Sequence, residues 1–300
     1  FFSLISDKNI YKISILLFSL FFISLLFVPM FGVEIKGSKR WLDLPIFPRF
    51  QPIEFLKPFL IILLSLVIGS RFTSNNYIKF LLSALIVLPI LILLILQPDI
   101  GQTLLISSVW LSLIFVSGIN LYFLSFLFFF CMLILGNLVF YLPKFSYIKS
   151  RIANFFDLSS KGNYQSQKAT DAIVDGGFFG KGIGEGTLNT KVPEAHTDYV
   201  ISVISEEFGI LLIISILMIF LILIFKIFKK IPIEKNNSNK LILIGSILLI
   251  IFQVLIHVGV NISILPTTGM TLPFLSYGGS SLLSCSILAG LILNFTKRKI

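Results

Sequence analysis

Long apolar runs separated by short polar segments dominate the chain. A membrane-spanning helix needs about 20 mostly apolar residues. Eight runs approach that length, at roughly 10–31, 54–70, 79–96, 101–118, 121–142, 199–225, 240–261 and 281–296. They are rich in Leu, Ile and Phe and lack the alternation of barrel strands. Because only helices and closed barrels satisfy backbone polar groups in lipid, the pattern predicts an all-α, polytopic helical bundle.

One polar segment is much longer than the others. Residues 143–198 form a stretch too long to be a simple connection between helices. We therefore expect a single transmembrane domain over residues 1–300, with a large extracytoplasmic loop at 143–198. The chain shows no internal repeat, which weakens the interpretation as an inverted-repeat transporter.

Composition supports a membrane protein, because 56% of the residues are hydrophobic and 13% are charged, against roughly 25% charged in soluble domains. Cys131 and Cys285 lie inside apolar runs, so no disulfide framework is expected. The first run has no small-residue cleavage site after it. We interpret it as a membrane span and not as a removable signal peptide.

The distribution of basic residues predicts the orientation in the membrane. An even number of spans places both ends of the chain on one side, and the short basic segments 226–240 and 297–299 indicate that this side is cytoplasmic. The net charge of +10 then lies on the cytoplasmic face, where anionic lipid attracts it. The outer loops are neutral overall but densely charged, so we expect the functional site, acting on a charged substrate, to lie on the outer face.

The first outer cluster covers residues 37–58. Pro45, Pro48 and Pro52 exclude a regular helix. Glu54 and Lys57 are three positions apart at the start of the second run, so they share a helix face and can pair. One interpretation is an interfacial anchor with a structural ion pair. The other is a cationic rim for an anionic headgroup, made by Lys39, Arg40 and Lys57.

The long loop holds two features. The segment GGFFGKGIGEG (Gly176–Gly186) has no surrounding βαβ unit, so we expect a flexible, closely packed loop and no dinucleotide site. Thr197 is a candidate N-cap that places Asp198 in the first turn of the following helix. The helix dipole favours an ionised carboxylate there. Asp198 could therefore accept a proton or stabilise a cation, or it could simply complement the dipole.

Glu194, His196 and Asp198 alternate at the end of this loop. Their spacing could suit a divalent cation such as Mg²⁺ or Mn²⁺, although no further ligands complete a set. The third outer cluster, residues 261–281, is broken by Pro266 and Pro273. Its end offers backbone N–H groups and hydroxyls for an anion, or it is a packed interhelical turn. The candidate residues are Ser276, Tyr277, Gly278, Gly279 and Ser280.

Two polar stripes run through the apolar runs. Asp198, Ser202 and Glu206 repeat every four residues, as do Gln253, His257 and Asn261. Ionisable residues in spans tend to face wet cavities, so we expect both stripes to line a cavity open to the outside. Alternatively, Glu206 and its neighbour hydrogen-bond to adjacent helices. Gln97 and Asp99 are further candidate cavity-lining residues.

Four segments in chain order resemble the SEDS family, the shape, elongation, division and sporulation proteins that include FtsW and RodA. They are GSKRWLDL with QPIEFLK, QPDIGQT at 97–103, PEAHTDYVISVISEEFG, and LPTTGMTLPFLSYGGSS. Ile53 departs from the Ser usual in the family. PEAHTD and the last segment are more like the division branch, FtsW, whereas QPDIG and RWLDL lean towards RodA.

The resemblance implies an inner-membrane peptidoglycan glycosyltransferase that polymerises lipid II at the division septum. It implies ten spans, so the first two would be missing from this chain. It implies that the family's essential acid corresponds to Asp198 and that its Glu/Lys pair corresponds to Glu54 and Lys57. The implied partners are a class B penicillin-binding transpeptidase (FtsI-like), other division proteins and membrane lipid, with no nucleic acid.

Three alternatives remain at this point. A RodA-like polymerase would act in elongation, a lipid II flippase would need polar groups accessible from both faces, and a scaffold would have no activity. The polar residues gather in the segments expected in the outer half of the membrane, which favours the enzyme over the flippase.

Overall fold

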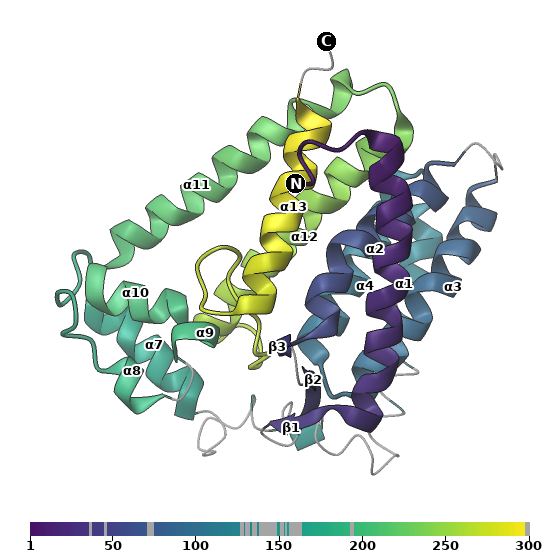
Figure 1. The fold of residues 1–300 in the computed structure, drawn as a ribbon. Helices are drawn as coiled ribbons and strands as arrows, with labels where there is room; N and C mark the ends of the chain where they lie inside the picture. Colours follow the sequence, from purple (N-terminus) through teal and green to yellow (C-terminus); the bar gives the residue numbers. More distant parts are fainter. Residues whose placement is uncertain are drawn as a thin grey trace. The chain divides into compact units, whose positions relative to one another are not determined.

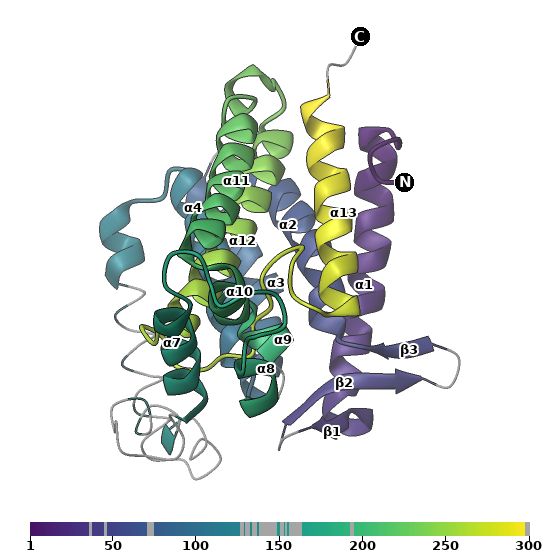
Figure 2. The ribbon, with the colours of Figure 1, turned by 90° about the vertical axis from the view of Figure 1, so that its left-hand side faces the viewer.

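A computed structural model of the chain describes residues 1–35, 38–44, 47–70, 75–126, 164–192 and 195–297, together with scattered positions between 127 and 163. It divides into two compact units, which we describe separately. Unit 1 comprises residues 1–120, 224–252 and 278–300. Unit 2 comprises residues 121–223 and 253–277. Figures 1 and 2 show the elements from two sides.

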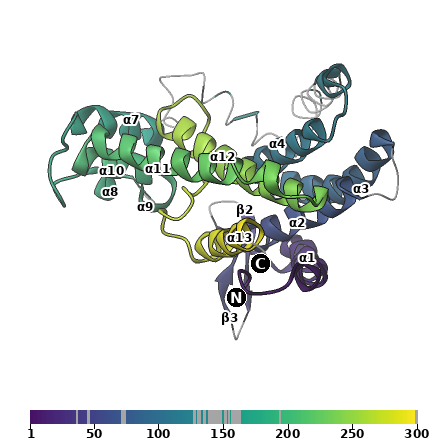
Figure 3. The same ribbon diagram turned by 90° about the horizontal axis from the view of Figure 1, so that it is seen from above.

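Unit 1 is built on apolar helices. They are α1 (Asp7–Phe31), α2 (Pro52–Ile68), α3 (Asn76–Leu96), α4 (Ile100–Val116) and α13 (Gly279–Thr296), with the first part of α12 (Asn237–Asn261). The Asn75 side chain caps α3 by accepting the Tyr77 N–H at 2.9 Å. Lys297 Nζ, just after α13, donates to the carbonyl of Ser3, just before α1, at 2.7 Å. Figure 3 views α1 and α13 from above.

A small antiparallel sheet lies between α1 and α2 in the chain. Its strands β1 (Val33–Ile35), β2 (Ser38–Leu44) and β3 (Phe47–Phe50) pair in chain order. The helical bundle predicted from the sequence is confirmed, but the sheet was not predicted beyond the exclusion of a regular helix. Pro48 lies in β3, one of the two edge strands, where a missing backbone donor is tolerated.

Unit 2 contains α7 (Tyr164–Gly176), α8 (Leu188–Lys191), α9 (Ala195–Asp198), α10 (Val200–Phe208) and most of α11 (Ile210–Phe228), with the end of α12. A short 3₁₀ turn, η3 (Ile231–Ile233), follows α11. Helices α7 and α10 pack along each other.

Among the described residues, five helices are long and apolar enough to cross a membrane, starting at Asp7, Asn76, Ile210, Asn237 and Gly279. The expected spans at 54–70 and 101–118 correspond to α2 and α4, which have 17 residues each. The expected run at 121–142 lies largely outside the described residues.

The expected span at 199–225 is wrong as a single helix. Gly209 has φ +82° and ψ 172°, which ends α10, and α11 begins at Ile210. A positive φ suits glycine, so the polar part of the run forms a separate short helix. Glu206 and Glu207 therefore lie before the spanning helix and not within it.

Candidate functional site

Asp198 is the last residue of the single helical turn α9. Its side chain is partly exposed, and the next helix has Tyr199 at its N-cap position. The prediction that Thr197 caps this helix is wrong, because Thr197 lies inside α9. Asp198 consequently sits just before α10 and not in its first turn. A break between two short helices leaves the carboxylate accessible while the backbone on both sides is held.

Asn261 fastens the backbone at Asp198. Its Nδ2 donates to the Asp198 carbonyl at 3.2 Å and to the His257 carbonyl at 2.8 Å. Its Oδ1 accepts from the Ser202 N–H at 3.1 Å and from the Ser202 hydroxyl at 2.8 Å. The Asn261 side chain is fully buried, so all of its polar groups are engaged with protein.

The loop before α13 fastens α9 from another direction. Ser276 Oγ donates to the Thr197 carbonyl at 2.7 Å, and the Tyr277 N–H donates to the His196 carbonyl at 3.3 Å. The His196 and Tyr277 rings meet edge to face, with centroids 5.7 Å apart. We call Asp198, His196, Asn261, Ser276 and Tyr277 the Asp198 cluster; it joins residues from the second and third outer segments.

The hydrogen bond from the Tyr277 N–H to the His196 carbonyl changes the expectation of an anion site at residues 276–280. That N–H is not available to an anion, so residues 276–277 act as a packed turn that holds α9. Gly278, Gly279 and Ser280 belong to unit 1, where Ser280 Oγ accepts the Gln51 N–H at 3.1 Å.

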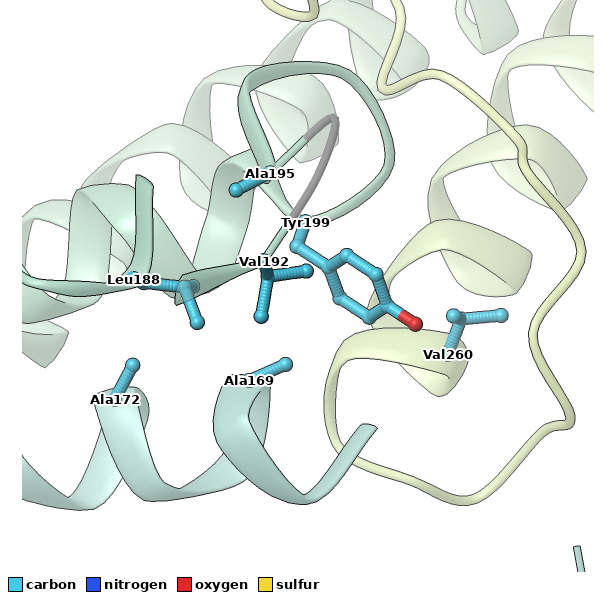
Figure 4. Close-up of a cluster of buried hydrophobic side chains, with 7 residues drawn as sticks. All are labelled: Ala169, Ala172, Leu188, Val192, Ala195, Tyr199 and Val260. Atoms are coloured by element: carbon cyan, nitrogen blue, oxygen red, sulfur yellow. The ribbon is translucent and has the colours of Figure 1, made fainter. Parts of the chain in front are cut away.

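A small apolar core supports the Asp198 cluster (Figure 4). It draws on α7, α8, α9 and α12 and is almost completely buried. Tyr199, next to Asp198, is 2% exposed within it. Its members are Ala169, Ala172, Leu188, Val192, Ala195, Tyr199 and Val260. Because alanines line one side, α7 approaches closely, and the residues flanking Asp198 are held by packing as well as by hydrogen bonds.

Glu206 is a buried structural carboxylate. It accepts the Thr187 and Leu188 N–H groups, each at 3.0 Å, and Lys181 Nζ at 3.1 Å. Burial acts to raise the pKa of Glu206, but the two backbone donors and the Lys181 charge outweigh it, and the pKa is lowered overall. Its interpretation as a partner for neighbouring segments is confirmed. Asp175 in turn raises the pKa of Lys181 by hydrogen bonding.

Glu206 also lines a cavity of about 230 Å³ between α7, α8 and α10, but the other members of the two predicted stripes do not line it. Of the other stripe members, Ser202, Gln253, His257 and Asn261 are buried and bonded to protein, whereas Asp198 is partly exposed. Gln253 Nε2 donates to the Thr271 carbonyl at 3.0 Å, and His257 Nδ1 lies 2.7 Å from the Met270 carbonyl oxygen. The loop at 270–271 thus occupies the position where a wet cavity was expected for these two residues.

Unit 1 contains a second group of buried charges. Glu54 and Lys57 form the predicted ion pair, with Oε2 and Nζ 2.8 Å apart, and Gln102 Nε2 donates to Glu54 Oε1 at 2.5 Å. Lys57 is only 2% exposed. The expectation that it belongs to an exposed cationic rim is therefore wrong, because α2 buries it beside its partner.

Asp99 lies at the start of α4 and extends this buried group. Arg40 Nη1 is 3.6 Å from Asp99 Oδ1, and Gln51 Nε2 donates to Asp99 Oδ2 at 3.1 Å. Burial raises the pKa of Asp99, although the Arg40 charge opposes the shift. Gln97 is also buried and donates to the Leu25 carbonyl at 3.4 Å. Of the expected rim, Lys39 is exposed on β2.

Three participating residues were not selected from the sequence: Lys181, Gln51 and Gln102. Lys181 is the one cation inside the glycine-rich segment, and Gln51 and Gln102 both stand in the segments quoted for the family resemblance. Glu194 lies outside the described residues. Among the residues that the structure describes, no group of three or more His, Cys, Asp or Glu side chains could hold a metal ion.

The chemistry available at the Asp198 cluster is that of a carboxylate on a held backbone. Its backbone is held by Asn261, and its flanks are held by Ser276 and Tyr277. Such a group can accept a proton or orient a hydroxyl with little reorganisation.

The chain was compared with known proteins. A family model described as "Cell cycle protein", covering FtsW, RodA and SpoVE, matches residues 1–299. A curated relative from Caulobacter vibrioides, named a probable peptidoglycan glycosyltransferase FtsW, is 30% identical over 297 residues, or 99% of this chain and 75% of the relative. A relative of the same name from Thiomicrospira cyclica is 35% identical over 289 residues, or 92% of this chain and 72% of the relative.

Solved structures agree with this relationship. One is described as the structural coordination of polymerization and crosslinking by a peptidoglycan synthase complex. It has a TM-score of 0.80 and 28% identity, covering 97% of this chain and 83% of that one. The rod shape determining protein RodA of Thermus thermophilus has a TM-score of 0.69 and 26% identity, covering 97% of this chain and 80% of RodA.

Proposed function

Because the chain belongs to the family of cell cycle proteins that includes FtsW, RodA and SpoVE, we propose that it is a peptidoglycan glycosyltransferase. Its substrate is lipid II, a disaccharide-pentapeptide on undecaprenyl pyrophosphate, polymerised at the outer face of the cytoplasmic membrane. The observation that carries the proposal is the partly exposed Asp198 between α9 and α10. Its backbone carbonyl accepts a hydrogen bond from Asn261, and Ser276 and Tyr277 hold the two residues before it.

The reaction transfers a glycosyl group between two lipid-linked sugars. The 4-hydroxyl oxygen of the acceptor forms a bond to the anomeric carbon of the donor, and the bond from that carbon to the pyrophosphate oxygen breaks. Asp198 accepts the hydroxyl proton as general base, and the lipid pyrophosphate leaves with the bonding electrons. The contribution of the Asp198 cluster is a held backbone from which the carboxylate can meet the hydroxyl.

Positive charge must stabilise the leaving pyrophosphate. Lys39, Arg40 and Arg49 are the cations of the first outer segment that have exposed surface, since Lys57 is buried with Glu54, and Arg49 pairs with the exposed Asp43. We assign headgroup binding to Lys39 and Arg40, and support of α2 and α4 to the Glu54–Lys57–Gln102 group. A divalent cation such as Mg²⁺ or Mn²⁺ could share the charge, but no step here depends on it.

The cellular role, the location and the partner are inferred from the similar proteins. The curated relatives quoted above are named FtsW, and one similar structure is a complex that couples polymerization to crosslinking. We propose a role in division in preference to elongation, at the septum, with a class B penicillin-binding transpeptidase as partner. We also propose that the basic segment after α11 faces the cytoplasm, which follows from its lysines.

The test is polymerisation of purified lipid II by the reconstituted protein and by the variants Asp198→Asn and Asp171→Asn. Loss of a general base lowers the rate by about 10²–10⁴-fold, so Asp198→Asn should form almost no glycan. Asp171 is an exposed acid on α7 that pairs with Lys168, and its variant should polymerise like the wild type.

Full polymerisation by a correctly folded Asp198→Asn variant would overturn the assignment of the base. Scoring headgroup translocation in the same vesicles separates a polymerase from a flippase. A protein that does neither, while binding the transpeptidase, would be a scaffold.

A further inference from the structure

The glycine-rich loop after α7 carries apolar side chains that project into the surroundings. Phe178 is 70% exposed, Phe179 83% and Ile183 80%. Single exposed apolar residues are ordinary on protein surfaces. Two adjacent phenylalanines and an isoleucine within six residues of a polar, glycine-rich loop form a group that points to a binding partner. We call these three side chains the loop tip.

Backbone hydrogen bonds fix the loop tip beside the start of a membrane-spanning helix. The Ile210 N–H, at the first residue of α11, donates to the Gly177 carbonyl at 2.9 Å. The Lys181 and Gly182 N–H groups donate to the Glu206 and Glu207 carbonyls at 2.8 and 3.0 Å. Figure 1 shows this loop at the end of α11 where the helix begins. The loop tip therefore lies beside the first residue of α11, a helix long and apolar enough to cross a membrane.

The glycines keep the loop close to the helix junction. A Cβ atom at Gly180 would lie 2.2 Å from the Glu207 carbonyl oxygen, and one at Gly209 would lie 2.2 Å from the Phe178 carbonyl oxygen. Neither position tolerates a side chain without backbone movement. The loop backbone is thus held against the junction while Phe178 and Phe179 stay exposed.

Lipid fits this surface better than water or a charged partner. The first turns of α11 also expose apolar side chains, with Leu211 47% and Ile214 50% exposed, so the loop tip continues a lipid-facing helix. The one cation of the loop, Lys181, pairs with Asp175 and Glu206 and does not oppose insertion as an isolated charge. Aromatic side chains are favoured at the membrane–water interface.

We propose that Phe178, Phe179 and Ile183 insert into the outer leaflet of the membrane and set the depth of α10. Because α10 follows directly after Asp198, the inserted tip also fixes the height of that carboxylate above the lipid. The insertion stands independently, whereas its catalytic consequence rests on the proposed glycosyltransferase function.

The experiment measures depth with the full chain in lipid nanodiscs. Phe179→Trp adds one tryptophan to Trp41 and Trp110, and its emission is obtained by subtracting the wild-type spectrum. The expected result is blue-shifted emission that lipids brominated near the carbonyl region quench strongly. Gln167→Trp, at the other end of α7, is the matched control, and acrylamide should quench it instead.

Emission from Phe179→Trp that matches the Gln167→Trp control would overturn the proposal. Protection from acrylamide that develops only when the transpeptidase is added would also overturn it, because the surface would then bind protein and not lipid.

A second variant tests the catalytic consequence. Phe178→Ser/Phe179→Ser should polymerise lipid II roughly tenfold more slowly than wild type in bilayers, since small misplacements of a catalytic group are costly. In detergent micelles, which adapt to any depth, both proteins should be equally active. Equal activity in bilayers would refute this consequence. If the wild type itself failed to polymerise lipid II, the proposed function would fail while the depth measurement still decided the insertion.

Discussion

At the scale of single residues, the structure distinguishes the residue proposed to do the chemistry, Asp198, from the residues that hold its backbone. Asp198 is partly exposed and carries the proposed proton transfer, whereas Asn261 is fully buried and binds the Asp198 carbonyl. Both belong to the polar stripes seen in the sequence. Their spacing along the chain could not distinguish them, because the difference lies in what surrounds each side chain.

Replacing Asn261 should therefore impair catalysis through Asp198. Asn261→Ala removes the bonds to Asp198 and Ser202, and the resulting shift should lower kcat by about 10–100-fold with little change in KM. Asn294→Ala is a matched control, since Asn294 is equally buried and bridges the Phe2 and Ile5 carbonyls in unit 1. The control should lose thermal stability without this selective loss of kcat. Equal kcat losses in the two variants would contradict a positioning role.

Glu206 should contribute stability that depends on pH. Its folded pKa lies below the ordinary value of 4.5, so its contribution is present above that value and is lost as the pH falls through the lowered pKa. Glu206→Gln should cost about 1–3 kcal/mol at neutral pH, because buried donors lose a charged acceptor. The melting temperatures of the wild type and Glu206→Gln in detergent, at pH 7 and near pH 4, measure this contribution to stability.

The difference in melting temperature between wild type and Glu206→Gln should shrink at the lower pH. The exposed Glu185→Gln variant serves as the reference, and it should melt like the wild type at both values. A difference that is independent of pH would show that shape, and not charge, explains the effect of Glu206.

At the scale of elements, the junction between α10 and α11 organises unit 2. The glycine-rich loop and the start of α11 approach each other main chain to main chain, and Gly180 and Gly209 permit this by lacking a Cβ atom. The sequence indicated a closely packed loop, which is confirmed. It did not indicate which segment the loop packs against.

Alanine substitutions can separate backbone strain from steric clash. Gly180 and Gly184 share a φ of +79°, but a Cβ at Gly180 meets the Glu207 carbonyl oxygen, whereas a Cβ at Gly184 meets nothing within 4 Å. Gly184→Ala should cost about 1–2 kcal/mol from strain alone. Gly180→Ala should cost more and should expose the loop to limited proteolysis. Equal melting temperatures for the two variants would contradict the packing described here.

Glu54 and Lys57 on α2 are both buried, and each charge is stabilised by the opposite charge of the other. Lys57→Met leaves Glu54 as a buried unpaired charge, and breaking such a pair costs about 3–5 kcal/mol. The double variant Glu54→Gln/Lys57→Met should recover most of that loss, because neither charge remains. Thermal unfolding of both variants provides the comparison. A double variant no more stable than Lys57→Met would argue that the pair is not isolated from other charges.

At the scale of the whole molecule, the chain contributes to two units, and α12 runs through both, passing from unit 1 to unit 2 after Phe252. The predicted site residues divide accordingly. The Asp198 cluster lies in unit 2, whereas Arg40, Glu54, Lys57, Asp99 and Ser280 lie in unit 1.

The orientation of the whole chain can be tested by cysteine labelling. In a Cys131→Ser/Cys285→Ser background, Asn236→Cys lies in the basic segment after α11, and Glu185→Cys lies in the glycine-rich loop. A membrane-impermeant maleimide should label Glu185→Cys in intact spheroplasts but Asn236→Cys only after permeabilisation, since basic loops remain cytoplasmic. The reverse pattern would invert the proposed topology.

The sequence by itself determined that this protein is a helical membrane protein. Its motifs identified the family and predicted a role for the acid at position 198. Those properties are local. The hydrophobicity of one continuous run decides whether a helix enters lipid, and a motif is recognised from consecutive residues without knowing what they contact. The Glu54–Lys57 pair was predictable for the same reason, because one helical turn separates its members.

Tertiary structure alone decided which distant groups surround Asp198 and which charges are buried. Asn261 reaches Ser202 across 59 residues, and Ser276 reaches Thr197 across 79. The burial of Lys57, the break at Gly209 and the fastening of Glu206 by Lys181 likewise depend on how helices and loops pack. Hydrogen bonds form wherever packing brings donors and acceptors together, and a periodic pattern along one chain does not encode that arrangement.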